Sequence, residues 1–129
     1  MKKFPKKILI FVFILILVIY LRFYLSFSGF GNYIKLVKKP RRNILNQNKL
    51  IFVSNLLGLI GSIIPYTTCL IKASVLKIVF NEEDELKVII GIKNNSDGIF
   101  KSHAWVTFNN KIILNNDLEI DSYRVIYRI

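Results

Sequence analysis

A long apolar run near the N-terminus constrains the fold more than any other feature of the sequence. Residues 8–21 are fourteen consecutive apolar residues, and after Arg22 the apolar character resumes as far as Phe27. A run of fourteen is common for a helix buried in a protein core, whereas a membrane span needs roughly 20 apolar residues. A chain of 129 residues forms one small core. How this chain shields the run from water therefore decides much of its architecture.

Three interpretations of this segment stay open. A signal peptide has a similar basic start, but only Ser26 and Ser28 offer small residues with suitable spacing for cleavage. A membrane span over residues 8–28 reaches the required length only with Arg22 near its far end, where the side chain can snorkel to the interface. The third interpretation is a helix packed on the protein core or lying on a membrane surface. Basic residues flank the run on both sides, so charge does not set an orientation.

Charge divides the chain into two halves. Residues 1–81 carry thirteen Lys or Arg and no acidic residue, whereas residues 82–129 carry six basic and eight acidic residues. The basic residues flank an apolar run and do not line an aromatic-interleaved face, so we expect no nucleic-acid partner. A single cysteine cannot form an internal disulfide, which favours a reducing cytoplasm.

Hydrophobic periodicity predicts helices first and strands second. Residues 29–32 should break the first helix, a second helix is expected over residues 46–60, and a third follows a threonine cap and runs to residue 81. The β-rich segments are residues 86–92, 102–108, 111–114 and 123–129. This order predicts an α+β fold, with N-terminal helices followed by a small antiparallel sheet. We assign residues 1–44 to the apolar helix and a basic connector, and residues 45–129 to the folded domain.

The only cysteine and the only histidine suggest a thiol and its base. Cys69 opens the third predicted helix, where unpaired backbone N–H groups and the helix dipole favour a thiolate and can receive an oxyanion. His103 lies in a predicted strand, and a base needs to be near its thiol only in space. The structural alternative is that both are ordinary core residues. One Cys and one His are too few for a metal site, and we expect no metal and no other cofactor.

A third member of the site is expected after the predicted hairpin. If residues 109–110 form a two-residue turn, Asn116 lies opposite His103, and a one-residue bulge places Asn115 there instead. An amide or carboxylate of the run from Asn115 to Asp117 could then accept from one imidazole nitrogen and hold the tautomer that takes the thiol proton. The alternative is that this polar run is merely a turn.

Several blocks of sequence, in this order and with suitable spacing, carry a family resemblance. They are Pro65-Tyr66-Thr67-Thr68-Cys69-Leu70, Val88-Ile89-Ile90-Gly91-Ile92, His103-Ala104-Trp105-Val106 and Asn109-Asn110-Lys111. Together they resemble the lasso peptide biosynthesis B protein, the transglutaminase-like leader peptidase of that pathway. The resemblance covers about residues 45–129, and more loosely the apolar, basic front of the chain.

The resemblance implies a transglutaminase-like, papain-like cysteine protease core. Such an enzyme removes the leader from a ribosomally made lasso precursor before ring closure, with Cys69 as nucleophile and His103 as base. The family's acidic third residue falls twelve positions after the histidine, which is Asn115 here, so Asn115 and Asp117 both remain candidates. The implied partners are the precursor peptide, a separate leader-recognition protein and the lasso cyclase. A separate recognition protein is expected because the chain lacks the recognition module that is fused in some relatives.

Two other functions remain open. One is a membrane-anchored, non-catalytic interaction protein whose basic front half binds anionic lipid. The other is a Cys-His acyltransferase of the same superfamily, and the exclusion of water from the thioester would decide between transfer and hydrolysis. For every alternative we expect a cytoplasmic protein, with attachment to the inner face of the cell membrane through residues 8–28 as an open possibility.

Overall fold

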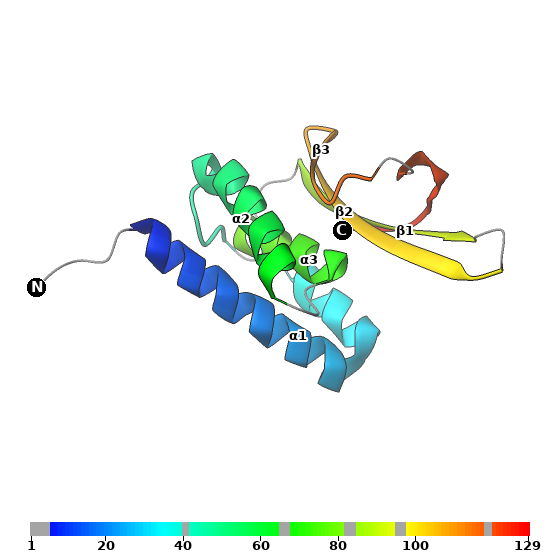
Figure 1. The fold of residues 1–129 in the computed structure, drawn as a ribbon, viewed down its shortest axis with the longest axis horizontal. Coiled ribbons are helices and arrows are strands. Elements are labelled where there is room, and N and C mark those ends of the chain that lie inside the picture. The colour runs from blue at the N-terminus through cyan, green and yellow to red at the C-terminus, as the bar shows by residue number, and fades with distance from the viewer. Residues whose placement is uncertain (1–5, 40–41, 65–67, 82–84, 95–97, 118–119) are drawn as a thin grey trace, which may run out of the picture.

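Three helices precede four strands in the computed structural model, which describes residues 6–39, 42–64, 68–81, 85–94, 98–117 and 120–129 (Figure 1). The helices are α1 (Lys6–Lys38), α2 (Leu50–Ile63) and α3 (Cys69–Val79). The strands are β1 (Leu86–Asn94), β2 (Phe100–Phe108), β3 (Lys111–Leu114) and β4 (Arg124–Arg128). Short 3-10 turns precede α2 at Gln47–Lys49 and β4 at Ile120–Ser122. The predicted α+β fold is therefore confirmed.

The strands form one antiparallel sheet in the order β3-β2-β1-β4. Asn109 and Asn110 connect β2 to β3, and both have left-handed φ angles, 52° and 65°. A two-residue turn of this kind matches the right-handed twist of the flanking strands and favours asparagine or glycine. The two-residue turn considered from the sequence is thus present.

The register of this hairpin differs from both expectations. A bulge lets Val106 pair with Leu114, where an unbroken ladder would pair it with Ile113. A bulge that placed Asn115 opposite His103 would move the β3 partner to a lower residue number, whereas the observed bulge moves it to a higher one. The ladder ends at Leu114, because Asn115 leaves the strand with a φ of 62°. The expectation that Asn115 or the next residue pairs with His103 in the sheet is wrong.

Helix α3 is the central layer of the molecule. One side of α3 packs against β1 and β2, and α1 and α2 pack against it from other directions (Figure 1). The α1 residues at the spacing of one helical face are fully or almost fully buried, and they belong to the same apolar core as α3 and the sheet: Ile10, Ile14, Val18 and Leu21. The core thus spans both predicted parts of the chain, and the division at residue 45 stays a prediction.

Helix α1 bends sharply at Gly29, whose φ and ψ of 82° and 167° are not helical. Only glycine adopts such angles without steric cost. The predicted break at residues 29–32 is therefore a kink, and the following segment returns Tyr33, Ile34 and Val37 to the core. Within the described residues, α1 is long and apolar enough to cross a membrane, a property that core helices and signal sequences share.

Tyr33, in the part of α1 after the kink, is fully buried in the core. Burial raises the pKa of Tyr33 to about 12, and the nearby Ser74 hydroxyl lowers it by a smaller amount. That hydroxyl donates to the main-chain carbonyl of Leu70 at 2.6 Å. The Tyr33 oxygen makes no hydrogen bond with the described part of the chain, so burial controls its ionisation.

Candidate active site

Cys69 is the first residue of α3, as the sequence predicts. The Thr68 side chain caps the helix, since its Oγ1 accepts from the main-chain N–H of Ile71 at 3.3 Å. The N–H of Lys72 donates to the Thr68 carbonyl at 3.1 Å. These two bonds fix the first turn without using the N–H groups of Cys69 and Leu70. The half-buried thiol therefore sits beside backbone donors that can receive a negatively charged oxygen.

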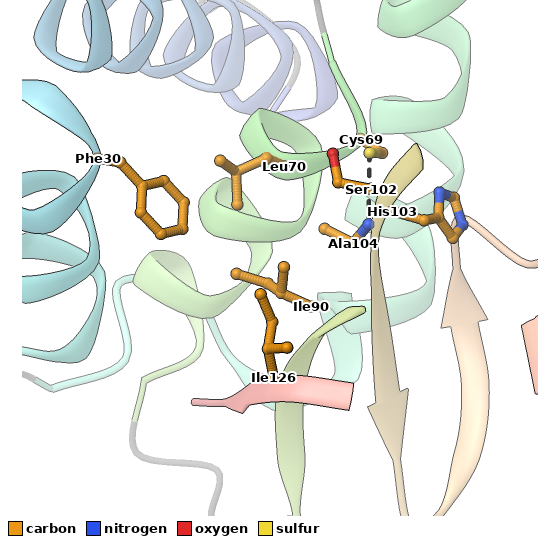
Figure 2. A pocket seen from close by; sticks show the side chains of 8 residues that line it. All are labelled: Phe30, Cys69, Leu70, Ile90, Ser102, His103, Ala104 and Ile126. Carbon is orange, nitrogen blue, oxygen red and sulfur yellow. Dashed lines mark hydrogen bonds between the residues drawn. The ribbon is translucent and has the colours of Figure 1, made fainter. Parts of the chain in front are cut away.

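The sulfur of Cys69 contacts the main chain of β2. Ser102 and Ala104 project from one side of this strand and His103 from the other, as strand alternation requires (Figure 2). Because β3 ends at Leu114, the segment of β2 that contains Ala104 has an open edge. There the N–H of Ala104 donates to Cys69 Sγ at 3.4 Å. The nucleophile candidate is thus joined to the residue directly after His103.

His103 is held by aromatic rings on its own side of β2. Its ring stacks on Trp105, with centroids 5.7 Å apart, and lies 5.5 Å from the ring of Tyr123. Gly91 pairs with His103 across the β1–β2 ladder. A Cβ at Gly91 would lie 2.8 Å from Tyr123 Cβ and 3.1 Å from the Trp105 ring. The missing side chain at Gly91 therefore leaves the space in which this aromatic cluster supports His103.

Asn115 connects the histidine to the cysteine. Its main-chain oxygen lies 2.7 Å from His103 Nε2. A carbonyl oxygen only accepts, so Nε2 carries the proton and the neutral ring keeps its lone pair on Nδ1. The side-chain Nδ2 donates to the carbonyls of Cys69 at 2.9 Å and Ala104 at 3.0 Å. Both partners are acceptors, which fixes the orientation of the amide.

The third member of the site differs from the expectation in one respect. From the sequence, a side-chain oxygen is expected to orient the histidine, whereas the main chain of Asn115 provides the acceptor in the structure. Asp117, the second candidate, has its main-chain carbonyl bonded to the N–H of Ile120 at 3.1 Å, at the start of a 3-10 turn. The left-handed conformation of Asn115 allows its carbonyl and its amide to face two different partners.

Several residues that shape the site were not assigned a role from the sequence. The contact from Ala104 uses only a backbone N–H, which any residue except proline has, so its identity carries no signal. Tyr123 reaches His103 from the far end of the chain, and no local pattern predicts that contact. Gly91 does have a signal, because an isolated glycine in a strand often marks the close approach of another group.

A cavity of about 270 Å³ lies beside the thiol. Its walls come from the α1 kink, the start of α3 and three strands of the sheet (Figure 2): Phe30, Cys69, Leu70, Ile90, Ser102, His103, Ala104 and Ile126. Cys69 and His103 therefore line one cavity, although no hydrogen bond joins these two described side chains. Most of the remaining wall is apolar. This arrangement offers a thiol, an imidazole held by the Asn115 carbonyl and an apolar seat for part of a substrate.

The comparison with protein families agrees with this geometry. A family model described as the transglutaminase-like superfamily matches residues 15–128. The matched range covers most of the chain and includes Cys69, His103 and Asn115. A search of curated proteins and a search of solved structures gave no match that passes the significance threshold. The chain therefore belongs to the transglutaminase-like superfamily, and this membership points to an activity of the cysteine protease or acyltransferase type.

Proposed function

We propose that this protein is a cysteine peptidase that removes the leader peptide from a ribosomally made lasso precursor. The observation that carries the proposal is the connection through Asn115, whose carbonyl orients the His103 ring and whose amide holds the main chain of Cys69. Family membership supports the type of chemistry. The resemblance of the Cys69 and His103 blocks to the lasso leader peptidase supports the substrate.

Cys69 and His103 have complementary roles in this mechanism. Cys69 Sγ attacks the carbonyl carbon at the end of the leader, and His103 Nδ1 takes the thiol proton. The N–H of Cys69, at the start of α3, donates to the oxyanion that forms. When the C–N bond breaks, the proton passes from Nδ1 to the leaving nitrogen, which becomes the amine of the core peptide. Water then attacks the thioester, with Nδ1 as base, and releases the leader as a carboxylate.

Access of water favours hydrolysis over transfer to an amine. Ser102 is exposed and forms part of the cavity wall beside Cys69. His103 is only half-buried. Water can therefore reach a thioester on Cys69 from this side. In the cell, the partners would be the precursor, a separate protein that presents the leader, and the cyclase that uses the freed amine, all in the cytoplasm.

Mass spectrometry of a candidate precursor tests the proposal. The precursor and its leader-binding partner are incubated with wild-type protein, Cys69→Ala or Ser54→Ala, a control substitution in α2 away from the cavity. We expect a mass loss equal to the leader with wild type and Ser54→Ala, and none with Cys69→Ala. An intact precursor after incubation with wild type, despite proven binding to the partner, contradicts the proposal. Added glycine ethyl ester identifies an acyltransferase if the leader emerges mainly as the amine adduct.

A further inference from the structure

Residues 8–21 of α1 are apolar on all sides of the helix, but the protein covers only one of these sides. The buried face packs on the core, and the opposite face carries exposed apolar side chains at helical spacing of three or four residues. We call these residues the α1 stripe: Leu9, Val12, Ile16, Ile19, Tyr20, Phe23 and Phe27, each between 43% and 84% exposed. From Leu9 to Phe27 the stripe is about 27 Å long at 1.5 Å per residue.

Such a surface needs an apolar partner. A helix that is hydrophobic on all sides is normally found inside a protein or in a membrane. Isolated apolar residues on a protein surface are common, but a continuous patch marks a binding surface. The α1 stripe is continuous and is interrupted by no charged side chain. Arg22, the charged residue within this segment, lies about 100° around the helix from Phe23, and its side chain donates to Ser26.

The charges around the α1 stripe indicate which partner covers it. Lys6 and Lys7 lie exposed before it, and Lys35 and Lys38 lie exposed after it. No acidic residue occurs before Glu82. A second copy of this chain would bring like charges together across the stripe, whereas an anionic lipid surface attracts each nearby basic residue by about 1 kcal/mol. Tyr20 and the two phenylalanines also suit the boundary between headgroups and acyl chains.

We propose that the α1 stripe binds the surface of a bilayer that contains anionic lipid. Helix α1 then lies along the surface and does not cross it. A span would place lipid around the whole helix, but Ile10, Ile14, Val18 and Leu21 are already covered by the protein core. Crossing the membrane would require this face to leave α3.

This orientation brings the membrane close to the cavity. The stripe ends at Phe27, the chain bends at Gly29, and Phe30 lines the cavity beside Cys69. A substrate held at the bilayer surface would therefore approach the site along α1. Lipid binding is independent of the proposed peptidase activity, because its test measures binding alone.

Vesicle flotation of the full-length protein tests the proposal. The vesicles contain phosphatidylcholine alone or with about one quarter phosphatidylglycerol. We expect flotation with the anionic vesicles, and at least tenfold weaker binding for Ile16→Glu. The matched control is Ile99→Glu, because Ile16 and Ile99 are almost equally exposed, at 60% and 61%. Circular dichroism checks that both variants fold. Equal loss of binding in both variants, or no binding by wild type, overturns the proposal.

Two further measurements separate the other occupants of the stripe. If an N-terminal tag is protected from protease inside sealed vesicles while the C-terminus is digested, α1 spans the bilayer and the surface orientation is wrong. If sedimentation without lipid shows a dimer that Ile16→Glu dissociates and Ile99→Glu does not, the stripe covers a second copy. If both tags are digested from outside and the lipid-free protein is a monomer, the proposed orientation is supported.

Discussion

The two sides of β2 carry different parts of the candidate active site. The side with Ser102 and Ala104 faces α3 and forms a largely apolar cavity. The side with His103 carries a ring held by Trp105 and Tyr123. Asn115 lies at the open edge of the strand, where its carbonyl accepts from His103 and its side-chain amide donates to the Ala104 carbonyl. His103 also lines the cavity beside Cys69. We expect the apolar wall residues to act mainly on substrate binding and His103 on proton transfer, so substitutions should separate the two.

Replacement of the base should have the largest effect. We expect His103→Ala to lower kcat for leader cleavage by about 10²–10⁴-fold, because no other described group beside the thiol can take its proton. The ring also packs on Trp105 and Tyr123, so the melting temperature should fall as well. Single-turnover kinetics and thermal unfolding measure both quantities. Cleavage at the wild-type rate would show that the side of β2 carrying His103 does not serve the chemistry.

Asn115→Asp tests the connection between the two sides. In the structure, the side chain of Asn115 donates to two carbonyl oxygens, and a carboxylate would repel both. We expect activity to fall about 10–100-fold, which corresponds to the 1–3 kcal/mol cost of losing a partner for a buried acceptor. Asn116→Asp adds the same charge at an exposed neighbouring position and serves as the control. Equal or higher activity in Asn115→Asp would mean that the side chain accepts from the histidine instead.

Gly91→Ala tests the packing beneath His103. The added Cβ would collide with Tyr123 and approach the Trp105 ring. We expect a loss of about 1–3 kcal/mol in the free energy of unfolding, together with a lower kcat, since overpacking forces neighbouring groups to move. Gly58→Ala is the control, because nothing lies within 4 Å of its new Cβ. That exposed change in α2 should stabilise the protein by roughly 0.5–1 kcal/mol. Equal unfolding energies for the two variants would contradict the proposed role of Gly91.

Phe30→Ala tests the other side of β2. Its ring lines the cavity and contacts Tyr127, with centroids 5.9 Å apart. We expect KM for a precursor with an apolar residue at the scissile bond to rise several-fold, while kcat changes little. Phe100→Ala, which removes a 70%-exposed ring outside this cavity, should leave both constants unchanged. A lower kcat with constant KM would show that the two sides of β2 are not separated in this way.

Tyr33→Phe should have the smallest effect on stability and activity, because it removes one hydroxyl from the helical part of the core, outside the cavity. At neutral pH the variant should be equally or slightly more stable, by up to about 1 kcal/mol, since the buried hydroxyl has no partner among the described residues. The folded pKa of about 12 lies above the ordinary value of 10. The contribution of Tyr33 to the free energy of unfolding is therefore complete below pH 10, and it falls as the pH rises toward 12, by about 1.4 kcal/mol per pH unit. Urea unfolding at pH 8 and pH 11 should show a larger loss in wild type than in Tyr33→Phe.

Local patterns predicted most of the secondary structure and part of the site. Helical and strand periodicity placed α2, α3 and the strands within a few residues, because side-chain spacing follows the backbone period. The threonine cap correctly placed Cys69 at the start of α3. The hairpin register failed because a bulge leaves little mark in the sequence.

The order of elements, an interruption of the first helix within residues 29–32, and the identity of the single thiol and the single imidazole follow from the sequence. These features follow from side-chain size, polarity and backbone freedom, which act locally. The tertiary structure alone decided that the Asn115 carbonyl orients His103, that Ala104 contacts the thiol, and that one face of α1 is left uncovered. The contacts of Asn115 and Ala104 join β2 to other segments of the chain, and they use main-chain groups that nearly every residue has. Only the packing of α3 against the sheet selects which of these groups meet.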